Sequence, residues 1–246
     1  MTAPSTPAFN FDPELKRKLL FTALALLLYR IGAHIAAPGV NVQALSDFIR
    51  NSAAAGFFGL YDMLGGGLSR ATVFALGIMP YISASIIFQL VGGVVPTIGK
   101  MQKEEEGRKT LTQWTRYMTV FIAFAQAYTF TLFTESIPGA VANPGFASRT
   151  VMVVTLTVGA IFVMWLGEQI TERGIGNGMS LLIFAGIAAR IPAEGKTILD
   201  SRGGLIFTAV CVAALIIIIG VVFVEQAQRR IPVQYAKRMV GRRMYG

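Results

Sequence analysis

Long apolar runs alternate along this chain with short segments that are charged or rich in glycine and proline. A hydrocarbon core about 30 Å thick is crossed by roughly 20 mostly apolar helical residues. Six runs are candidates for such spans: residues 17–37, 71–95, 118–133, 150–166, 179–189 and 205–224. The last run contains no charged residue. The pattern therefore predicts an all-α, polytopic membrane protein with about six spanning helices.

Breaking residues and charges set the expected ends of these spans. Pro38 and Gly39 should end the first helix, and Pro80 should kink the second, as membrane helices tolerate. The basic residues 16–18 before the first run are also typical of a signal peptide. Arg30 interrupts that run before a possible cleavage site, which favours a retained helix. As the one charge deep in a predicted span, Arg30 should form an ion pair or extend toward the interface.

Composition and charge placement agree with a membrane protein. Charged residues make up 14% of the chain, against about 25% in soluble domains. The net charge of +9 could indicate a nucleic-acid partner, but alternate loops carry fifteen and six Lys and Arg residues. This asymmetry places the N-terminus and the final basic stretch in the cytoplasm. Cys211 and His34 are the single cysteine and histidine, so we expect no disulfide framework, metal or cofactor.

Two glycine-containing segments resist a plain helical interpretation. Residues 51–70 hold an apolar stub too short to span, followed by three consecutive glycines. This stub could be a helix on the membrane surface or a re-entrant segment buried in protein. Residues 174–178, GIGNG, lie between two membrane helices and not after a strand. A tight cytoplasmic turn is therefore favoured there over a nucleotide-binding loop.

Polar side chains within the spans suggest structure or a hydrophilic path, and not catalysis. Ser83, Ser85 and Gln89 lie in the second run, where such groups link helices or line a pathway. Catalytic groupings are absent from the spans, and acidic residues lie at span edges or in loops. Coupled transporters usually carry acidic groups near the midplane. We therefore expect no enzymatic activity and favour a passive channel or a scaffold.

Three longer strings resemble a known family. They are GGGLSRATVFALGIMPYISASIIFQL at 65–90, MWLGEQITERGIGNGMSLLIFAGI at 164–187 and VEQAQRRIPVQYAKRMVGRRMYG at 224–246. Together with shorter matches in the same order, they are similar to bacterial members of the SecY family of protein-conducting channels. That family has ten helices in two pseudo-symmetric halves around an hourglass pore. The resemblance implies an N-terminal half with helices 1–5 over residues 1–195, and helix 6 with the start of a cytoplasmic loop over 196–246. We therefore expect four further spans after Gly246.

The resemblance also implies roles for particular apolar residues. The plug of the family would occupy about 57–70, through Phe57, Phe58, Leu60, Tyr61, Met63 and Leu64. The pore ring would comprise Ile78, Ile82, Met179 and Ile183. Each helix supplies two ring residues four positions apart, which places them on one helix face. A ring of apolar side chains dewets readily and can close around a moving polypeptide. Family members often have isoleucine where Met179 stands, but methionine is adaptable enough for the same role.

Further expectations from the family concern the lateral gate and the partners. Helices 2 and 3 would form one side of the gate, with Ser83, Ser85 and Gln89 in its polar seam. The cytoplasmic face would contact ribosomes or the SecA motor through basic residues. The residues assigned to that contact are Arg108, Lys109, Lys237, Arg238, Arg242 and Arg243. The resemblance also implies SecE and SecG as companion subunits, a signal-bearing polypeptide as cargo, and the bacterial inner membrane as the location.

Two other classes of function remain open from the residues alone. A small-solute transporter or channel could have a similar number of helices. A membrane scaffold or insertase without a pore would need no plug-like segment. The apolar ring and the lack of midplane charge favour a polypeptide channel over an ion site.

Overall fold

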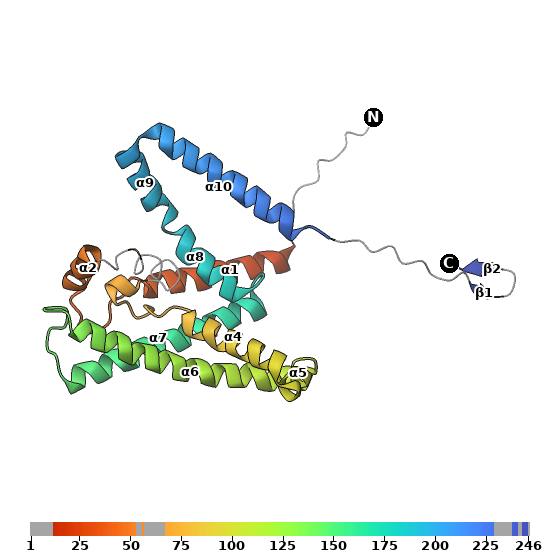
Figure 1. The fold of residues 1–246 in the computed structure, drawn as a ribbon, viewed down its shortest axis with the longest axis horizontal. Coiled ribbons are helices and arrows are strands. Elements are labelled where there is room, and N and C mark those ends of the chain that lie inside the picture. The colour runs from red at the N-terminus through yellow and green to blue at the C-terminus, as the bar shows by residue number, and fades with distance from the viewer. Residues whose placement is uncertain (1–11, 53–55, 57–66, 229–237, 241–242, 246) are drawn as a thin grey trace. The chain divides into compact units, whose positions relative to one another are not determined.

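The computed structural model describes residues 12–52, 56, 67–228, 238–240 and 243–245 and divides the chain into two compact units, Met1–Ile191 and Pro192–Gly246. The first unit holds α1 (Pro13–Gly32), α2 (Val42–Asn51), the 3-10 turn η1 (Leu68–Arg70), α4 (Met79–Val94), α5 (Pro96–Met101), α6 (Glu105–Glu135), α7 (Phe146–Arg173) and α8 (Gly178–Ala188) (Figure 1). Helix α9 (Ile191–Arg202) begins at the boundary. The second unit continues with α10 (Gly204–Glu225), β1 (Arg238–Val240) and β2 (Arg243–Tyr245). The sequence-based division at residue 195 remains a prediction.

A helix overlaps each of the six predicted runs, but the helices differ in length. In the described part of the chain, α6, α7 and α10 are long and apolar enough to cross a membrane, with 31, 28 and 22 residues. Helix α4 is apolar but shorter, with 16 residues. Helices α1 and α8 have 20 and 11 residues. The predicted all-α class is confirmed, with one short hairpin, β1–β2, among the described elements.

The second run is not one kinked helix, so that prediction was wrong. Helix α4 begins at Met79, and Pro80 lies in its first turn and not in its interior. Proline is well accommodated there, because the N–H that it lacks would have no partner within the helix. Residues 71–78 form turns instead, with positive φ angles of 44° at Ala71 and 54° at Gly77.

This irregular segment, residues 71–78, is nevertheless buried, and its backbone is bonded to the end of the first run. The Ala37 N–H donates to the Ala71 carbonyl, and the Val73 N–H donates to the Ile35 carbonyl, both at 2.8 Å. On the other side, a Cβ placed on Gly159 of α7 would overlap the Val73 carbonyl oxygen. Irregular backbone at membrane depth requires such internal partners and close packing.

Other boundaries also differ from the sequence-based expectation. Helix α1 ends at Gly32 and not at Pro38 and Gly39, which places Arg30 in its last turn. A positive charge there interacts favourably with the helix C-terminus. The ion pairs found among the described residues do not include Arg30. Helix α6 begins at Glu105, so much of the expected basic loop 100–116 is helical, and α9 occupies part of a loop predicted between spans five and six.

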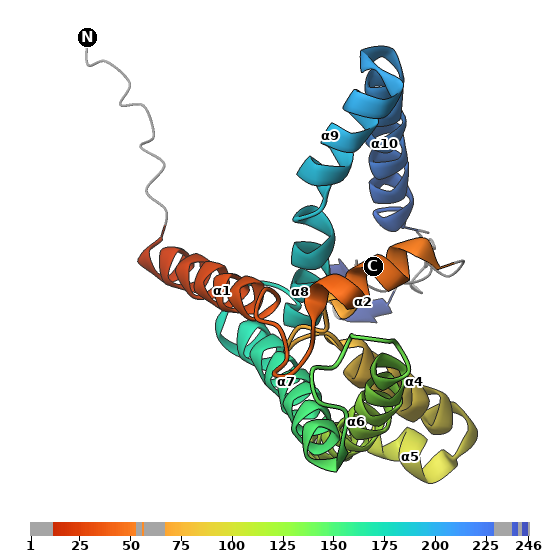
Figure 2. The ribbon, with the colours of Figure 1, turned by 90° about the vertical axis from the view of Figure 1, so that its left-hand side faces the viewer.

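Helices α6 and α7 form an antiparallel pair, side by side in Figures 1 and 2. An ion pair joins them near each end: Arg116 to Glu168 at 2.8 Å, and Arg149 to Glu135 at 2.7 Å. Arg116 and Glu135 are separated by about 28 Å along α6 at 1.5 Å per residue. This separation matches the thickness of a hydrocarbon core. The two ion pairs therefore bracket the apolar segment of the helix pair.

The contact between Gly159 and the irregular segment gives a stability prediction. Gly159→Ala should destabilise the protein by about 1–3 kcal/mol, because its methyl group would overlap backbone and not a movable side chain. The matched control is Gly93→Ala in α4, where no atom lies within 4 Å of the added carbon. Thermal unfolding in detergent should show a lower midpoint for Gly159→Ala alone. Equal shifts for both variants would contradict the close packing.

Candidate functional site

The four predicted ring residues converge on one apolar cluster, although they come from segments 100 residues apart in the sequence. Ile78 is 3% exposed and belongs to the buried part of the cluster, whereas Ile82, Met179 and Ile183 are half-buried and pack against it. The buried members are Ala25, Tyr29, Phe74, Ile78, Val163, Leu166, Ile170 and Leu182. We call this group the ring cluster. Helices α1, α4, α7 and α8 and the irregular segment all contribute to it.

On α4, the expected spacing of the two isoleucines is kept although the helix begins later than predicted. Ile78 lies just before α4 with near-helical backbone angles. The Ile82 N–H donates to the Ile78 carbonyl at 3.1 Å, which is the bond of a helical turn. Ile78 and Ile82 are therefore one helical turn apart.

Two glycines, Gly178 of α8 and Gly167 of α7, allow these helices to pack directly against each other. A Cβ on Gly178 would overlap the Gly167 carbonyl oxygen, so the two backbones touch. A Cβ on Gly167 would overlap the sulfur of Met179. Asn177 caps α8, since its side-chain oxygen accepts from the N–H groups of Met179 at 3.0 Å and Ser180 at 3.3 Å. The start of α8, and with it the position of Met179, is set by this crossing.

Aromatic rings join the ring cluster to its surroundings. The Phe74 ring lies between Tyr29 of α1 and Phe162 of α7, with centroid distances of 6.1 and 5.6 Å and nearly parallel planes. A Cβ on Gly32 would overlap the Phe74 ring. The irregular segment is thus held between two helices directly beside Ile78. This arrangement was not expected from the sequence, because the pattern of residues 71–78 predicted a helix.

The polar residues assigned to the gate separate into two sets. Gln89 donates a hydrogen bond to the Ser85 hydroxyl at 3.3 Å, and both line a hollow of about 320 Å³ between α4 and α6. Arg108 and Gln102 also line it, and the Gln102 side chain donates to the Phe88 carbonyl at 3.2 Å. Ser83 is not among the lining residues, because two positions along a helix turn it to another face.

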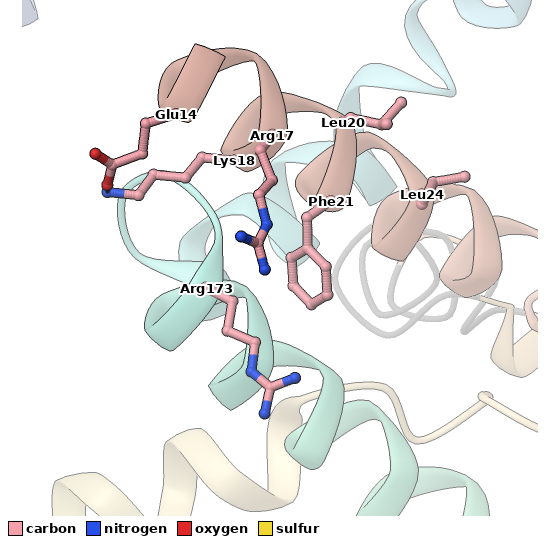
Figure 3. Close-up of a pocket in the computed structure, with 7 residues that line it drawn as sticks. All are labelled: Glu14, Arg17, Lys18, Leu20, Phe21, Leu24 and Arg173. Carbon is pink, nitrogen blue, oxygen red and sulfur yellow. The ribbon is translucent and has the colours of Figure 1, made fainter. Parts of the chain in front are cut away.

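A second hollow, of about 440 Å³, lies at the basic end of α1, beside the end of α7 (Figure 3). Arg17 of α1 and Arg173 of α7 both line it, and the guanidinium group of Arg17 points into the space between the two helices. Lys18 pairs instead with Glu14 at 3.0 Å. The hydrogen bond from Lys18 and its positive charge hold the pKa of Glu14 below its ordinary value. Positive charge is therefore concentrated at this end of the two helices.

Several predicted site residues lie outside the part of the chain that the structure describes. These are the plug residues Phe57, Phe58, Leu60, Tyr61, Met63 and Leu64, and the basic residues Lys237 and Arg242. Arg238 and Arg243 lie in the strands of the hairpin. Arg108 and Lys109 are exposed in the first turns of α6. The described part of the chain contains no cluster of three or more metal-ligating residues.

The chain has long apolar helices, a buried irregular segment and an apolar cluster shared by α1, α4, α7 and α8. Together these features define a multi-pass membrane protein. The SecY family model matches residues 72–246. This chain belongs to the SecY family. It is 53% identical over 245 residues to protein translocase subunit SecY of Mycobacterium tuberculosis, covering 95% of this chain and 56% of the relative. The corresponding Escherichia coli protein is 48% identical over 242 residues, covering 94% and 54%. The chain thus spans about half the length of these relatives.

Solved structures support the same fold. A protein-conducting channel matches with a TM-score of 0.61 and 23% identity, over 99% of this chain and 55% of that one. Sec61 in a canine ribosome–channel complex from the endoplasmic reticulum matches with a TM-score of 0.61 and 22% identity, over 94% and 52%. This chain therefore shares its fold with about half the length of such channels.

The two glycines at the α7–α8 crossing should differ in their tolerance of substitution. Gly178→Ala should lower stability by about 1–3 kcal/mol, since its methyl group meets the Gly167 backbone. Gly167→Ala meets the side chain of Met179, which can change rotamer, and should cost less. Unfolding midpoints of both variants in detergent would measure the difference. A larger loss for Gly167→Ala would contradict the proposed contact.

Proposed function

We propose that this chain forms the first half and sixth helix of a channel that passes unfolded secretory proteins across a membrane. In this proposal the channel also releases membrane segments laterally into lipid, and it is a passive pore driven by cytoplasmic partners, with no catalysis of its own. The observation that carries the proposal is the convergence of Ile78, Ile82, Met179 and Ile183 on one apolar cluster. The printed names of the relatives, protein translocase subunits, support it.

The ring cluster suits a seal around a moving chain. Isoleucine side chains present apolar surface with no hydrogen-bonding groups, so water between them is poorly bound. A translocating polypeptide would contact this surface without specific hydrogen bonds. Met179 adds a flexible side chain that can adapt to segments of different size. In the described part of the chain, the half-buried state of Ile82, Met179 and Ile183 leaves these three available to such a chain.

The proposal also includes the orientation of the chain in the membrane. The ion pairs at the two ends of α6 and α7 support a span between Arg116 and Glu135. Arg17, Arg173 and Arg108 lie at helix ends that the positive-inside rule assigns to the cytoplasm. We therefore place the N-terminus in the cytoplasm and the protein in the bacterial inner membrane.

The proposal also assigns a plug, a gate seam and binding partners to this chain. We assign 57–70 to the plug; within it, Leu68 is buried in a cluster with Leu45 and Ile49 of α2. The hydrogen-bonded Ser85 and Gln89 support a polar gate seam on α4, with Ser83 on another face. The basic residues of α6 and the hairpin region would contact a ribosome or SecA. A similar channel bound to a ribosome supports that assignment, and SecE and SecG are proposed as companion subunits.

Crosslinking tests the channel directly. Cysteine placed at Ile82 or Ile183, in the protein assembled in membranes, should crosslink to a secretory polypeptide arrested in transit. The physical reason is that a chain passing through the ring must touch these side chains. A bifunctional thiol reagent followed by gel analysis measures the yield.

Control cysteines belong at exposed positions that are not members of the ring cluster, such as Val154 of α7 and Leu27 of α1. These should give little product. Efficient crosslinking from the controls, with none from Ile82 or Ile183, would overturn the assignment of the ring.

A further inference from the structure

We propose that Thr22 of α1 is a positioning residue for the pore ring, because its hydroxyl group holds the turn between α7 and α8 that sets the start of α8. The inference rests on the proposed channel function and adds to it a residue that is neither in the ring nor in the gate. Thr22 is 4% exposed and lies on the same helix as two members of the ring cluster, Ala25 and Tyr29.

The hydroxyl of Thr22 takes part in two hydrogen bonds. It donates to the Lys18 carbonyl of its own helix at 2.9 Å. It also accepts from the backbone N–H of Ile175 at 3.2 Å, 153 residues further along the chain. The first bond orients the hydroxyl proton toward α1, which leaves a lone pair directed at the turn. Thr22 therefore ties α1 to the α7–α8 turn through a fixed geometry.

The second bond distinguishes Thr22 from the buried threonines of α6 and α7. Hydroxyl groups of buried threonines in helices commonly bond back to the carbonyl four residues earlier. Thr115, Thr119 and Thr157 do so in α6 and α7. Thr22 makes this local bond and in addition accepts from another segment. A role confined to its own helix does not account for the second bond.

The turn is held on its other side by a threonine that bonds in the same way. Thr171 of α7 donates to the Gly167 carbonyl at 2.9 Å and accepts from the Gly178 N–H at 2.9 Å. A Cβ placed on Gly174 would come within 2.5 Å of the Thr22 hydroxyl oxygen. The backbone of the turn thus lies directly against Thr22. Thr171 binds the N–H of Gly178, at the end of the turn where α8 begins.

The turn held by Thr22 lies close in the sequence to the ring residue Met179. Met179 lies four residues after Ile175 and directly after Gly178. A shift of the turn therefore moves the first turn of α8, which carries Met179, before it affects the rest of the protein. Ile78 and Ile82 are on a different helix and should be little affected. Loss of the Thr22 hydroxyl is expected to displace one side of the ring selectively.

The test compares Thr22→Val, which removes the hydroxyl at similar shape, with Thr22→Ser, which keeps it. The matched control is Thr119→Val, at a threonine that is 1% exposed and bonds within α6. The first readout is amide hydrogen exchange of the peptide covering residues 168–178 in the purified protein. Thr22→Val should raise the exchange rate of this turn by roughly three- to tenfold, as expected for one lost hydrogen bond. Thr22→Ser and Thr119→Val should leave it unchanged.

The second readout is crosslinking to an arrested secretory polypeptide from cysteine at Met179 and, separately, at Ile82. Thr22→Val should lower the yield from Met179→Cys relative to Ile82→Cys, and Thr22→Ser should restore it. If exchange and crosslinking in Thr22→Val match those of the unmodified protein, the positioning role is wrong. If neither cysteine crosslinks even with Thr22 present, the proposed function fails instead, and the exchange measurement still decides whether Thr22 holds the turn.

Discussion

Backbone polar groups at membrane depth are tolerated only where the protein itself supplies their partners, and this constraint governs the architecture of the chain. Residues 71–78 are not helical, yet they are largely buried and supply Phe74 and Ile78 to the ring cluster. They are accommodated because residues 35–37 bond to their backbone and because Gly159 lets α7 approach it closely. This support holds the segment that leads into α4, and Ile78 at its end packs in one cluster with Val163 and Ile170 of α7.

The same constraint explains why glycine and threonine recur around the ring. Gly167 and Gly178 bring two helix backbones into contact, while Thr22 and Thr171 satisfy the N–H groups of the turn between them. The apolar side chains of the ring make no directional bonds, so their placement depends on these neighbours. A seal for a polypeptide of any sequence must lack hydrogen-bonding specificity. Its geometry must therefore be fixed by neighbouring residues that are not part of the seal. Ion pairs at both ends of α6 and α7 add a rigid support next to it.

Much of this could be predicted from the sequence, but not the parts that depend on distant contacts. Hydropathy located a helix in each run, and the i, i+4 spacing of Ile78 with Ile82 was readable from the chain. Sequence could not reveal that Pro80 begins a helix, because the partners of residues 71–78 lie about 35 residues earlier and 85 later. Arg30 was expected deep in a span, but α1 ends at Gly32, where the Phe74 ring packs, and not at Pro38. The role of Thr22 depends on a partner 153 residues away.

Ion conductance tests the central claim that these four apolar side chains seal a pore. The measurement compares planar bilayers containing the protein with Ile82→Ser and Ile183→Ser against bilayers containing the paired Ile→Leu variants. Serine places polar groups in the ring and should allow water and ions to enter, whereas leucine keeps the apolar surface. We expect a several-fold rise in resting conductance for the serine variant and none for the leucine variant. Equal, low conductance in both would contradict a seal formed by these side chains.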